Sequence, residues 1–443
     1  MRKNSKHAVL TDPVGPLLVR MTIPMSIGIV GMVAFNLIDT FFVGRLGILD
    51  LAAMSFTFPV VLVISSIARG LGVGTAAVVS RAIGRGDHEQ VRRLTTDAIS
   101  LSFIVVFLFV GIAYATIDPL FRLLGAQGDV LIRIKSYMRI WYLGMPVVVI
   151  PMVGNNAIRA TGDMKTPTLI MLIAICVNLI LDPLFIFGIG PFPRMELAGA
   201  ALATVCARTI TMIAAFLVLS RREKMLTPAR VKFRLVFNTW KRVLYVGLPA
   251  AATFIIIPLS AGFITRLVSQ YGNASVAGFG VATRIETFGL TLVAALSSVL
   301  VPFVGQNIGA GNNERIMKSA RYSHFFSLVW GGFLFLLFLT LGKPIARIFN
   351  NDHEVIRVTV LYLRIVALSY GLQGIVQLNS AVFNALRRPL HAAGLSLLRG
   401  LGFFIPLAML GSFLLGVNGI FFAAAVSNGI TAVISLLLLK KVL

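Results

Sequence analysis

Ile83-Gly-Arg-Gly-Asp-His-Glu89 is a short polar stretch between two long apolar runs, and it returns later as Ile308-Gly-Ala-Gly-Asn-Asn-Glu314. Aligning Gly86 with Gly311 gives an offset of 225 residues. The same offset relates further pairs of residues: Pro24 to Pro249, Gly47 to Gly272, Tyr137 to Tyr362 and Arg139 to Arg364. One offset kept over so many positions indicates that the chain carries the same fold twice. The offset slips to 220 near the end of each copy, where Gly199 meets Gly419.

The runs around these loops have the composition of a membrane protein. The chain of 443 residues is 57% hydrophobic and only 13% charged, whereas soluble domains carry about 25% charged residues. Apolar runs of about 20 residues or more predict membrane-spanning helices, and they exclude the roughly 10-residue alternating strands of a β-barrel. We predict twelve spans, at approximately 16–43, 51–79, 95–117, 132–158, 165–190, 196–219, 239–270, 276–306, 318–341, 354–385, 390–414 and 418–439.

The basic residues between the spans indicate the orientation of the chain. The formal net charge is +24, but Lys and Arg gather in short loops, as the positive-inside rule describes, so nucleic acid is not an expected partner. Their clusters at Arg2–Arg20, Arg81–Arg93, Arg221–Arg242 and Lys440–Lys441 all fall on one side, which we assign as cytoplasmic. Both termini are then cytoplasmic, and Met1–Leu10 lacks the apolar region of a cleavable signal peptide.

Six spans per copy is an even number, so both copies enter the membrane with the same orientation. Parallel repeats of this kind are related by an axis along the membrane normal, and substrate sites lie between them. We therefore expect an all-α integral membrane protein of two six-helix lobes. The N-terminal lobe is predicted at 1–219, a cytoplasmic linker at 220–238 and the C-terminal lobe at 239–443.

Two carboxylates, Asp39 and Asp182, lie inside apolar segments of the first copy. A charge in hydrocarbon costs several kcal/mol, at least about 2.5, so intramembrane acids usually face a cavity and carry function. Asn36 and Asp39 are spaced i, i+3, and Asn178 and Asp182 are spaced i, i+4, so each pair shares a helix face. Counting residues from the span ends places both acids and Thr204 at one level in the outer half of the lobe.

Close carboxylates in a low-dielectric site repel when both are charged, so we expect one of them to hold a proton near neutral pH. Ionised acids would hold a cationic substrate or Na+, and protonation from outside would release it. Pro183 disturbs the turn that carries Asp182 and can leave a carbonyl free to face a cation. Structural roles stay open: a helix cap for Asp182, a partly solvated position for Asp39 and a static kink at Pro24. Asn36 and Asn178 are alternatively interhelical contacts.

The segments Asn36-x-x-Asp39-Thr-Phe-Phe-Val-Gly44, Asn178-x-x-x-Asp182-Pro-Leu-Phe-Ile-Phe-Gly188 and Gly199-Ala-Ala-Leu-Ala-Thr204 resemble the multidrug and toxic compound extrusion (MATE) family. The paired loops, with Gly305-Gln306-x-x-Gly309-Ala310 in the second, extend the resemblance over nearly the whole chain. Within that family the chain looks like a member of the DinF branch of bacteria and archaea. The NorM branch has a glutamate where this chain has Ile257, so a NorM-type sodium site is not expected.

The resemblance implies a secondary antiporter in the plasma membrane of a bacterium or archaeon. It implies export of organic compounds in exchange for H+ or Na+, with no other cofactor. The acids favour cationic compounds, and a monomer is our expectation, although the sequence does not show the oligomeric state. It also implies coupling by Asp39, Asn178, Asp182 and Thr204, which would form the Na+ site, and a hinge at Pro24. Asn36, Tyr137, Asn155 and Arg208 are assigned to the substrate cavity of the same lobe.

Several of these assignments have alternatives. Arg208 follows Thr204 by one helical turn and would weaken a bound cation, but it is otherwise a structural partner for a carbonyl or a snorkelling side chain. Tyr137 is alternatively an aromatic residue at the membrane interface. In the second lobe, Arg284 and Glu286 are interpreted as a structural charge pair.

Other function classes are less well supported. The chain has no G-x-x-x-x-G-K-[ST] loop of an ATP-driven pump and no repeated selectivity-filter motif of a channel. Its five histidines and two cysteines form no catalytic or metal-binding pattern, so we do not expect an enzyme. A lipid or polysaccharide flippase of the same superfamily remains the alternative.

The repeat makes the prediction more specific. With the offset of 225, Asp39 corresponds to Ile264, and the counterpart of Asp182 falls among Ile405, Pro406 and Leu407. The coupling site is therefore predicted in the first copy alone.

Overall fold

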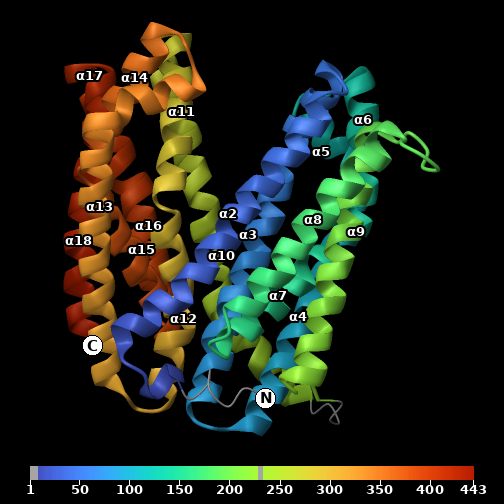
Figure 1. Cartoon of the computed structure of the whole chain (residues 1–443), viewed down its shortest axis with the longest axis vertical. Helices are drawn as coiled ribbons and strands as arrows, with labels where there is room; N and C mark the ends of the chain where they lie inside the picture. Colours follow the sequence, from blue (N-terminus) through green and yellow to red (C-terminus); the bar gives the residue numbers. More distant parts are fainter. Residues whose placement is uncertain (1–7, 228–232) are drawn as a thin grey trace. The chain divides into compact units, whose positions relative to one another are not determined.

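The computed structural model describes residues 8–227 and 233–443, and at Asn36 and Leu37 the backbone alone. Every regular element that it describes is helical (Figure 1). The first copy of the repeat contains α2 Val14–Gly44, α3 Ile48–Gly84, α4 His88–Ala115, α5 Ile117–Leu123, α6 Gly128–Leu143, α7 Met145–Ala160, α8 Lys165–Phe187, α9 Glu196–Leu217 and the π-helix η1 Val218–Arg222. The second contains α10 Phe233–Ser269, α11 Asn273–Gly289, α12 Thr291–Gly309, α13 Asn313–Phe349, α14 His353–Ala367, α15 Tyr370–Ala385, α16 Pro389–Leu397, the π-helix η2 Leu398–Phe404, α17 Ile405–Leu415 and α18 Val417–Val442.

Among the described residues, ten helices are long and apolar enough to cross a membrane, and up to twelve if each of two bent pairs counts as one span. The bent pairs are α6 with α7, at 45°, and α14 with α15, at 60°. They coincide with the predicted spans 132–158 and 354–385. The predicted span 276–306 is divided into α11 and α12 at Leu290. The all-helical membrane fold predicted from the sequence is confirmed, with more interruptions than the apolar runs indicated.

The described chain packs as two compact units. Unit 1 is built from Ile27–Ala251, and unit 2 from Val9–Ser26 together with Ala252–Leu443. The opening part of α2 therefore belongs to unit 2, and the opening part of α10 belongs to unit 1. The lobe boundaries predicted at 219 and 239 follow the sequence repeat, whereas the packing exchanges the first segments of the two copies.

The exchange is symmetric in sequence. The exchanged segments end at Ser26 and Ala251, which are again 225 residues apart, and each end lies two residues after a proline, Pro24 or Pro249. Both helices thus pass from one unit to the other at repeat-related positions.

Hydrogen bonds hold each exchanged segment in its unit. In unit 2, Arg315 of α13 donates from Nη2 to the carbonyl oxygens of Asp12 at 2.7 Å and Val9 at 3.1 Å. In unit 1, the indole Nε1 of Trp240 on α10 donates to the carbonyl of Asp97 at 2.9 Å and to Ser100 Oγ at 3.2 Å. Each unit is therefore completed by the other copy's opening segment.

The repeated loops have the same backbone geometry in both copies. Gly86 and Gly311 have φ of +74° and +77°, and Gly47 and Gly272 have φ of +137° and +93°. Side chains other than hydrogen are disfavoured at positive φ, so glycine is required at these turns. This agreement, at four positions related by the sequence offset, supports the internal repeat at the level of backbone conformation.

The C-terminal part of each copy contains a close helix contact that also needs glycine. A Cβ on Gly199 of α9 would lie 2.5 Å from the carbonyl oxygen of Phe185 on α8. A Cβ on Gly419 of α18 would overlap the backbone of Gly411 on α17. The pair that the sequence aligned at the offset of 220 thus serves the same packing role in unit 1 and unit 2.

The described start of the predicted linker is attached to unit 1. Arg222 forms an ion pair of 2.5 Å with Asp163, in the turn between α7 and α8. Burial opposes the ionisation of Asp163, but hydrogen bonds from Thr166 and Arg222 outweigh it and hold the pKa of this carboxyl below its usual value. Thr227 donates from its backbone N–H to Thr96 Oγ1 at 3.1 Å. Residues 228–232 of the predicted linker lie outside the described residues, and its last part, 233–238, belongs to α10.

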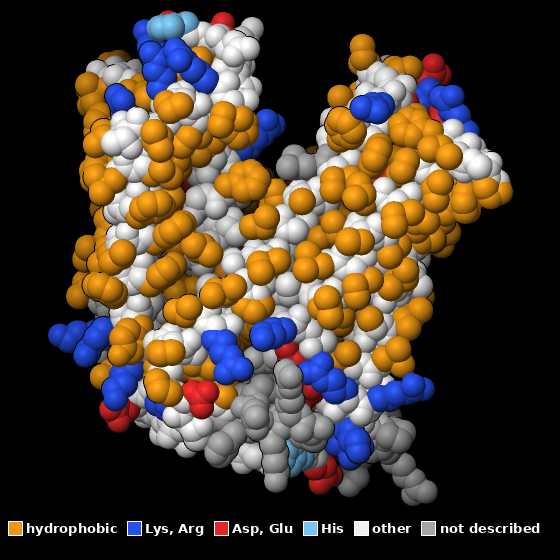
Figure 2. All heavy atoms as spheres, in the orientation of Figure 1, with side chains coloured by type: hydrophobic (Ala, Val, Ile, Leu, Met, Phe, Trp, Pro, Cys, Tyr) orange, Lys and Arg blue, Asp and Glu red, His pale blue; other side chains and the backbone are white. Residues whose placement is uncertain are grey.

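Hydrophobic side chains cover the visible flanks of the helices in each unit, and Lys and Arg gather near the helix ends (Figure 2). Inside unit 1, two apolar clusters follow one another along the helices. One contains Phe121, Tyr137 and Ile186, and the other contains Leu94, Ile158 and Leu219. An apolar exterior over an apolar core is what a bundle in lipid requires.

Candidate functional site

The two acids of unit 1 are both buried and act on each other. Asp39 on α2 is 7% exposed, and Asp182 on α8 is 0% exposed. The two carboxylates interact electrostatically, although they come from different helices. Asn178, one turn before Asp182, donates from Nδ2 to Asp182 Oδ1 at 3.0 Å. The structure therefore brings together three of the residues that the sequence singled out.

One oxygen of each carboxylate has no hydrogen-bond partner. Asp39 Oδ1 and Asp182 Oδ2 are both buried, and no described residue donates to either. Leaving a buried acceptor unsatisfied costs about 1–3 kcal/mol, and more when it is charged. A proton or a cation such as Na+ would satisfy both oxygens, since hard cations prefer oxygen ligands. The donor set of two carboxylates and one amide thus fits a site for a small cation.

Tyr137 lies beside this pair, on α6 before the 45° bend. It is 5% exposed and belongs to an apolar cluster of unit 1, so it is not an aromatic residue at the membrane surface. Both Asp39 and Asp182 act electrostatically on its hydroxyl. Its assignment to a substrate cavity stays a prediction.

The other residues predicted for this site are less closely joined to the acids. Thr204 is 8% exposed on α9, the helix packed against α8, but no hydrogen bond in the described part of the chain connects it to a carboxylate. Asn155 on α7 is half-buried, and its Oδ1 has no partner among the described residues. The side chain of Asn36 lies outside the described residues. Pro24 lies within α2, in the segment that packs in unit 2.

Arg208 on α9 contacts an aromatic ring instead of an acid. Its guanidinium carbon lies 4.9 Å from the centroid of the Phe35 ring on α2. Its Nε is buried without a hydrogen-bond partner, and no ion pair joins it to an acid within the described residues. Phe35 was not predicted from the sequence as a residue of the site. The available signal was that Phe35 precedes Asp39 by four residues and therefore shares its helix face.

In unit 2, the predicted charge pair of Arg284 and Glu286 is wrong. Glu286 accepts hydrogen bonds from the hydroxyl of Tyr362 at 2.5 Å and from Gln373 Nε2 at 3.0 Å. Arg284 is exposed and has no ion pair with Glu286 in the described part of the chain. The physical reason is the spacing, because residues i and i+2 on a helix point to different sides.

The groups that bind Glu286 lie on both sides of the 60° bend. Tyr362 belongs to α14 and Gln373 to α15, and Asn428 on α18 donates to Gln373 Oε1 at 3.2 Å and to Ser369 Oγ at 3.0 Å. Gln373 and Asn428 were not found from the sequence. Tyr362 could have been predicted as a site residue, because it is the repeat partner of Tyr137. In the structure each of these tyrosines faces a carboxylate.

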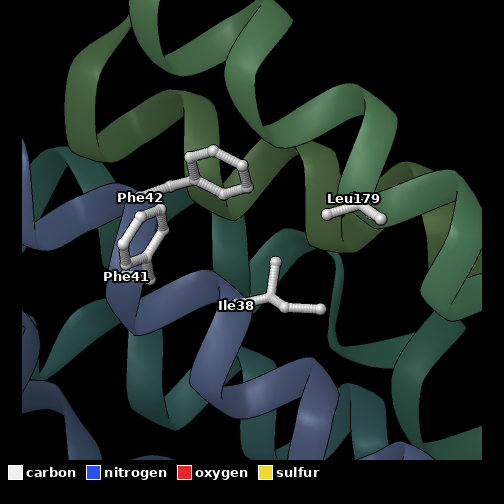
Figure 3. Close-up of a pocket in the computed structure, with 4 residues that line it drawn as sticks. All are labelled: Ile38, Phe41, Phe42 and Leu179. Carbon is white, nitrogen blue, oxygen red and sulfur yellow. The ribbon is translucent and has the colours of Figure 1, made fainter.

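An apolar pocket lies between α2 and α8 of unit 1 (Figure 3). Its lining residues are Ile38, Phe41 and Phe42 of α2 and Leu179 of α8, and its volume is about 440 Å³. Ile38 is next to Asp39 in the sequence, and Leu179 is next to Asn178. The Phe42 ring also packs edge-on against Phe187, with the centroids 6.3 Å apart. The helices that carry the two acids thus also line an apolar pocket, although neither acid is among its lining residues.

Comparisons with known proteins show which family this sequence and fold are similar to. The MatE family model matches the chain twice, at residues 24–184 and 249–410. The chain is 39% identical to the FAD transporter of Shewanella oneidensis over 423 residues, covering 96% of this chain and 94% of that protein. It is 27% identical to the probable multidrug resistance protein YoeA of Bacillus subtilis, over 89% of this chain and 84% of that protein.

Solved structures show the same fold. The MATE transporter VcmN of Vibrio cholerae in its bent form is 31% identical and superimposes with a TM-score of 0.92. The match covers 99% of this chain and 98% of the VcmN chain. A MATE structure in the bent conformation, at 24% identity and a TM-score of 0.92, shares the fold. The two matched segments and these relatives confirm the resemblance drawn from the sequence. The chain belongs to the MATE family and is a multi-pass membrane transporter of small molecules.

Proposed function

We propose that this transporter exports organic compounds in exchange for H+ or Na+, and that Asp39, Asp182, Asn178 and Thr204 of unit 1 form its coupling site. The observation that carries the proposal is the pair of buried carboxylate oxygens without partners, one on each acid. Two such oxygens in a low-dielectric site favour uptake of a positive charge, whether from a proton, Na+ or a cationic substrate.

The exchange follows from competition for this charge. With both acids ionised, the site holds an organic cation. Protonation or Na+ binding from outside neutralises the acids and releases the substrate. A hinge at Pro24 would couple this step to movement, because α2 passes from unit 2 to unit 1 two residues later. Such competition is sufficient for antiport.

The membrane assignment and the branch are part of the same proposal. The acids in the first copy and Ile257 in the second support a DinF-type rather than a NorM-type coupling arrangement. The distribution of Lys and Arg supports a bacterial or archaeal plasma membrane with both termini in the cytoplasm. The same acids, together with relatives that carry multidrug names, support an exporter over a flippase.

A flavin nucleotide such as FAD is a second candidate substrate. The supporting observation is the 39% identity to a FAD transporter over 96% of this chain. FAD carries negative phosphates, so its export would also be favoured by a membrane potential that is negative inside, worth about 2.3 kcal/mol per charge per 100 mV.

The proposal is tested in proteoliposomes that contain the purified wild-type protein. Transport of a fluorescent organic cation and of FAD is followed under an imposed pH gradient, an imposed Na+ gradient or neither. We expect transport against the substrate gradient under one of the two ion gradients and none without. Equal rates in all three conditions would reject coupled exchange, and the effective gradient identifies the ion.

A further inference from the structure

We propose that Arg208, backed by the ring of Phe35, is an anion-binding subsite that selects substrates bearing a phosphate or carboxylate group. The inference rests on the proposed export function, since it assigns a substrate class to the same cavity in unit 1. It differs from that function in predicting discrimination between charged and uncharged forms of one compound.

The first observation is that the guanidinium keeps its hydrogen-bonding edge free. The ring of Phe35 lies 4.9 Å from the guanidinium carbon, and Phe35 is 5% exposed, so the ring is held in place by its surroundings. A contact with an aromatic ring uses none of the five N–H donors that a guanidinium carries in its plane. The buried Nε has no partner among the described residues. An oxyanion can therefore approach along that edge and accept two parallel hydrogen bonds.

The second observation is that Arg208 lacks the acid partner that several other arginines of unit 1 have; among the described residues it shares this with Arg159. Arg133 lies 2.5 Å from Asp50, and Arg122 lies 2.7 Å from Asp118. Arg222 is similarly paired with Asp163 at 2.5 Å. Arg208 is half-buried in the same unit, yet no described acid forms an ion pair with it. A desolvated cation without a counter-ion is costly, and a bound anion would remove that cost.

The third observation is the order of groups along two helices. On α2, Phe35 precedes Asp39 by four residues, and on α9, Arg208 follows Thr204 by four. Four residues of helix rise about 6 Å, so Arg208 lies about one helical turn along the helix axis from the level of the acids. The stacked contact of Phe35 with Arg208 shows that these two levels match across the helices. The interior of unit 1 thus carries negative and positive charge at separate levels, which suits organic anions or zwitterions at the Arg208 level.

Flavins provide a matched set of probes, because riboflavin and flavin mononucleotide share one ring system and differ by a phosphate. Binding of both is measured by fluorescence quenching on the purified full-length protein, beside binding of a fluorescent organic cation. Arg208→Gln should weaken binding of flavin mononucleotide by roughly 10-fold or more, with riboflavin and the cation changed much less. Arg208→Lys should restore part of the affinity, because it keeps the charge but loses the planar fork.

Asp39→Asn tests independently how charge in the site affects binding of anions and cations, because it leaves Arg208 unchanged. Removing a nearby negative charge should strengthen binding of flavin mononucleotide and weaken binding of the cation. Equal losses for riboflavin and its phosphate in Arg208→Gln would reduce Arg208 to a structural role and overturn the inference. So would unchanged binding of flavin mononucleotide in that variant, or no binding of it by the wild type. Failure of the export function would be seen separately, as cation transport that ignores both ion gradients.

Discussion

Replacing Asp39 by asparagine is expected to reduce gradient-driven efflux by at least about 10-fold while leaving the protein folded. Asparagine keeps the size and polarity of the side chain but cannot bind or release a proton, and it binds a cation less well. The buried Oδ1 of Asp39 has no donor that the substitution would disturb. Initial rates in proteoliposomes under the effective ion gradient, compared at equal protein content, measure the loss.

Asp129→Asn is the matched control for this experiment. Asp129 is an exposed acid at the start of α6 in the same unit, so its neutralisation should leave the efflux rate unchanged. Asp182→Asn should behave like Asp39→Asn, although Asn178 already donates to its Oδ1 at 3.0 Å. Full gradient-driven efflux in Asp39→Asn would remove this residue from the coupling site.

Replacing Gly199 or Gly419 by leucine is expected to destabilise the folded protein by at least about 3 kcal/mol, at the upper end of overpacking effects. At Gly199 the new Cβ would lie 2.5 Å from the carbonyl oxygen of Phe185, and at Gly419 it would overlap the backbone of Gly411. Neither contact can be relieved by moving a flexible side chain, because backbone atoms are involved. The expected result is a lower melting temperature and a smaller yield of monodisperse protein in detergent.

Gly262→Leu controls for the effect of a larger side chain on a membrane helix. A Cβ on Gly262 of α10 would meet no heavy atom within 4 Å, so this variant should keep the wild-type melting temperature or exceed it slightly. Similar melting temperatures for all three variants would contradict the expected cost of crowding the close α8–α9 and α17–α18 contacts.

The architecture could be predicted from the sequence because it depends on patterns that extend over many residues. Apolar runs predicted the helices, and the offset of 225 predicted turns such as Gly86 and Gly311, whose φ values agree closely. The exchange of opening segments was not predicted. It depends on long-range contacts such as that of Trp240 with the carbonyl of Asp97, for which a repeat contains no signal.

Part of the candidate site could be predicted from the sequence, namely where residues one turn apart on the same helix decide the geometry. The spacing of Asn178 and Asp182 predicted a shared face, and the two side chains are hydrogen-bonded. Contacts between helices were missed, as with Arg208 on Phe35 and Glu286 on Tyr362 and Gln373. Rotation of one helix against another fixes such pairs, and that rotation is set by the packing of the whole unit. The roles assigned to Thr204, Asn155 and Pro24 stay predictions.

The central claim is that substrate and coupling ion compete for the acids of unit 1. It is tested most directly by measuring the affinity of a fluorescent organic cation from pH 5 to pH 9, at fixed Na+, for the wild type and Asp39→Asn. We predict that wild-type binding weakens as the pH falls, because protonation neutralises the site, and that the pH dependence is largely lost in Asp39→Asn. The same pH dependence in both proteins would contradict the claim.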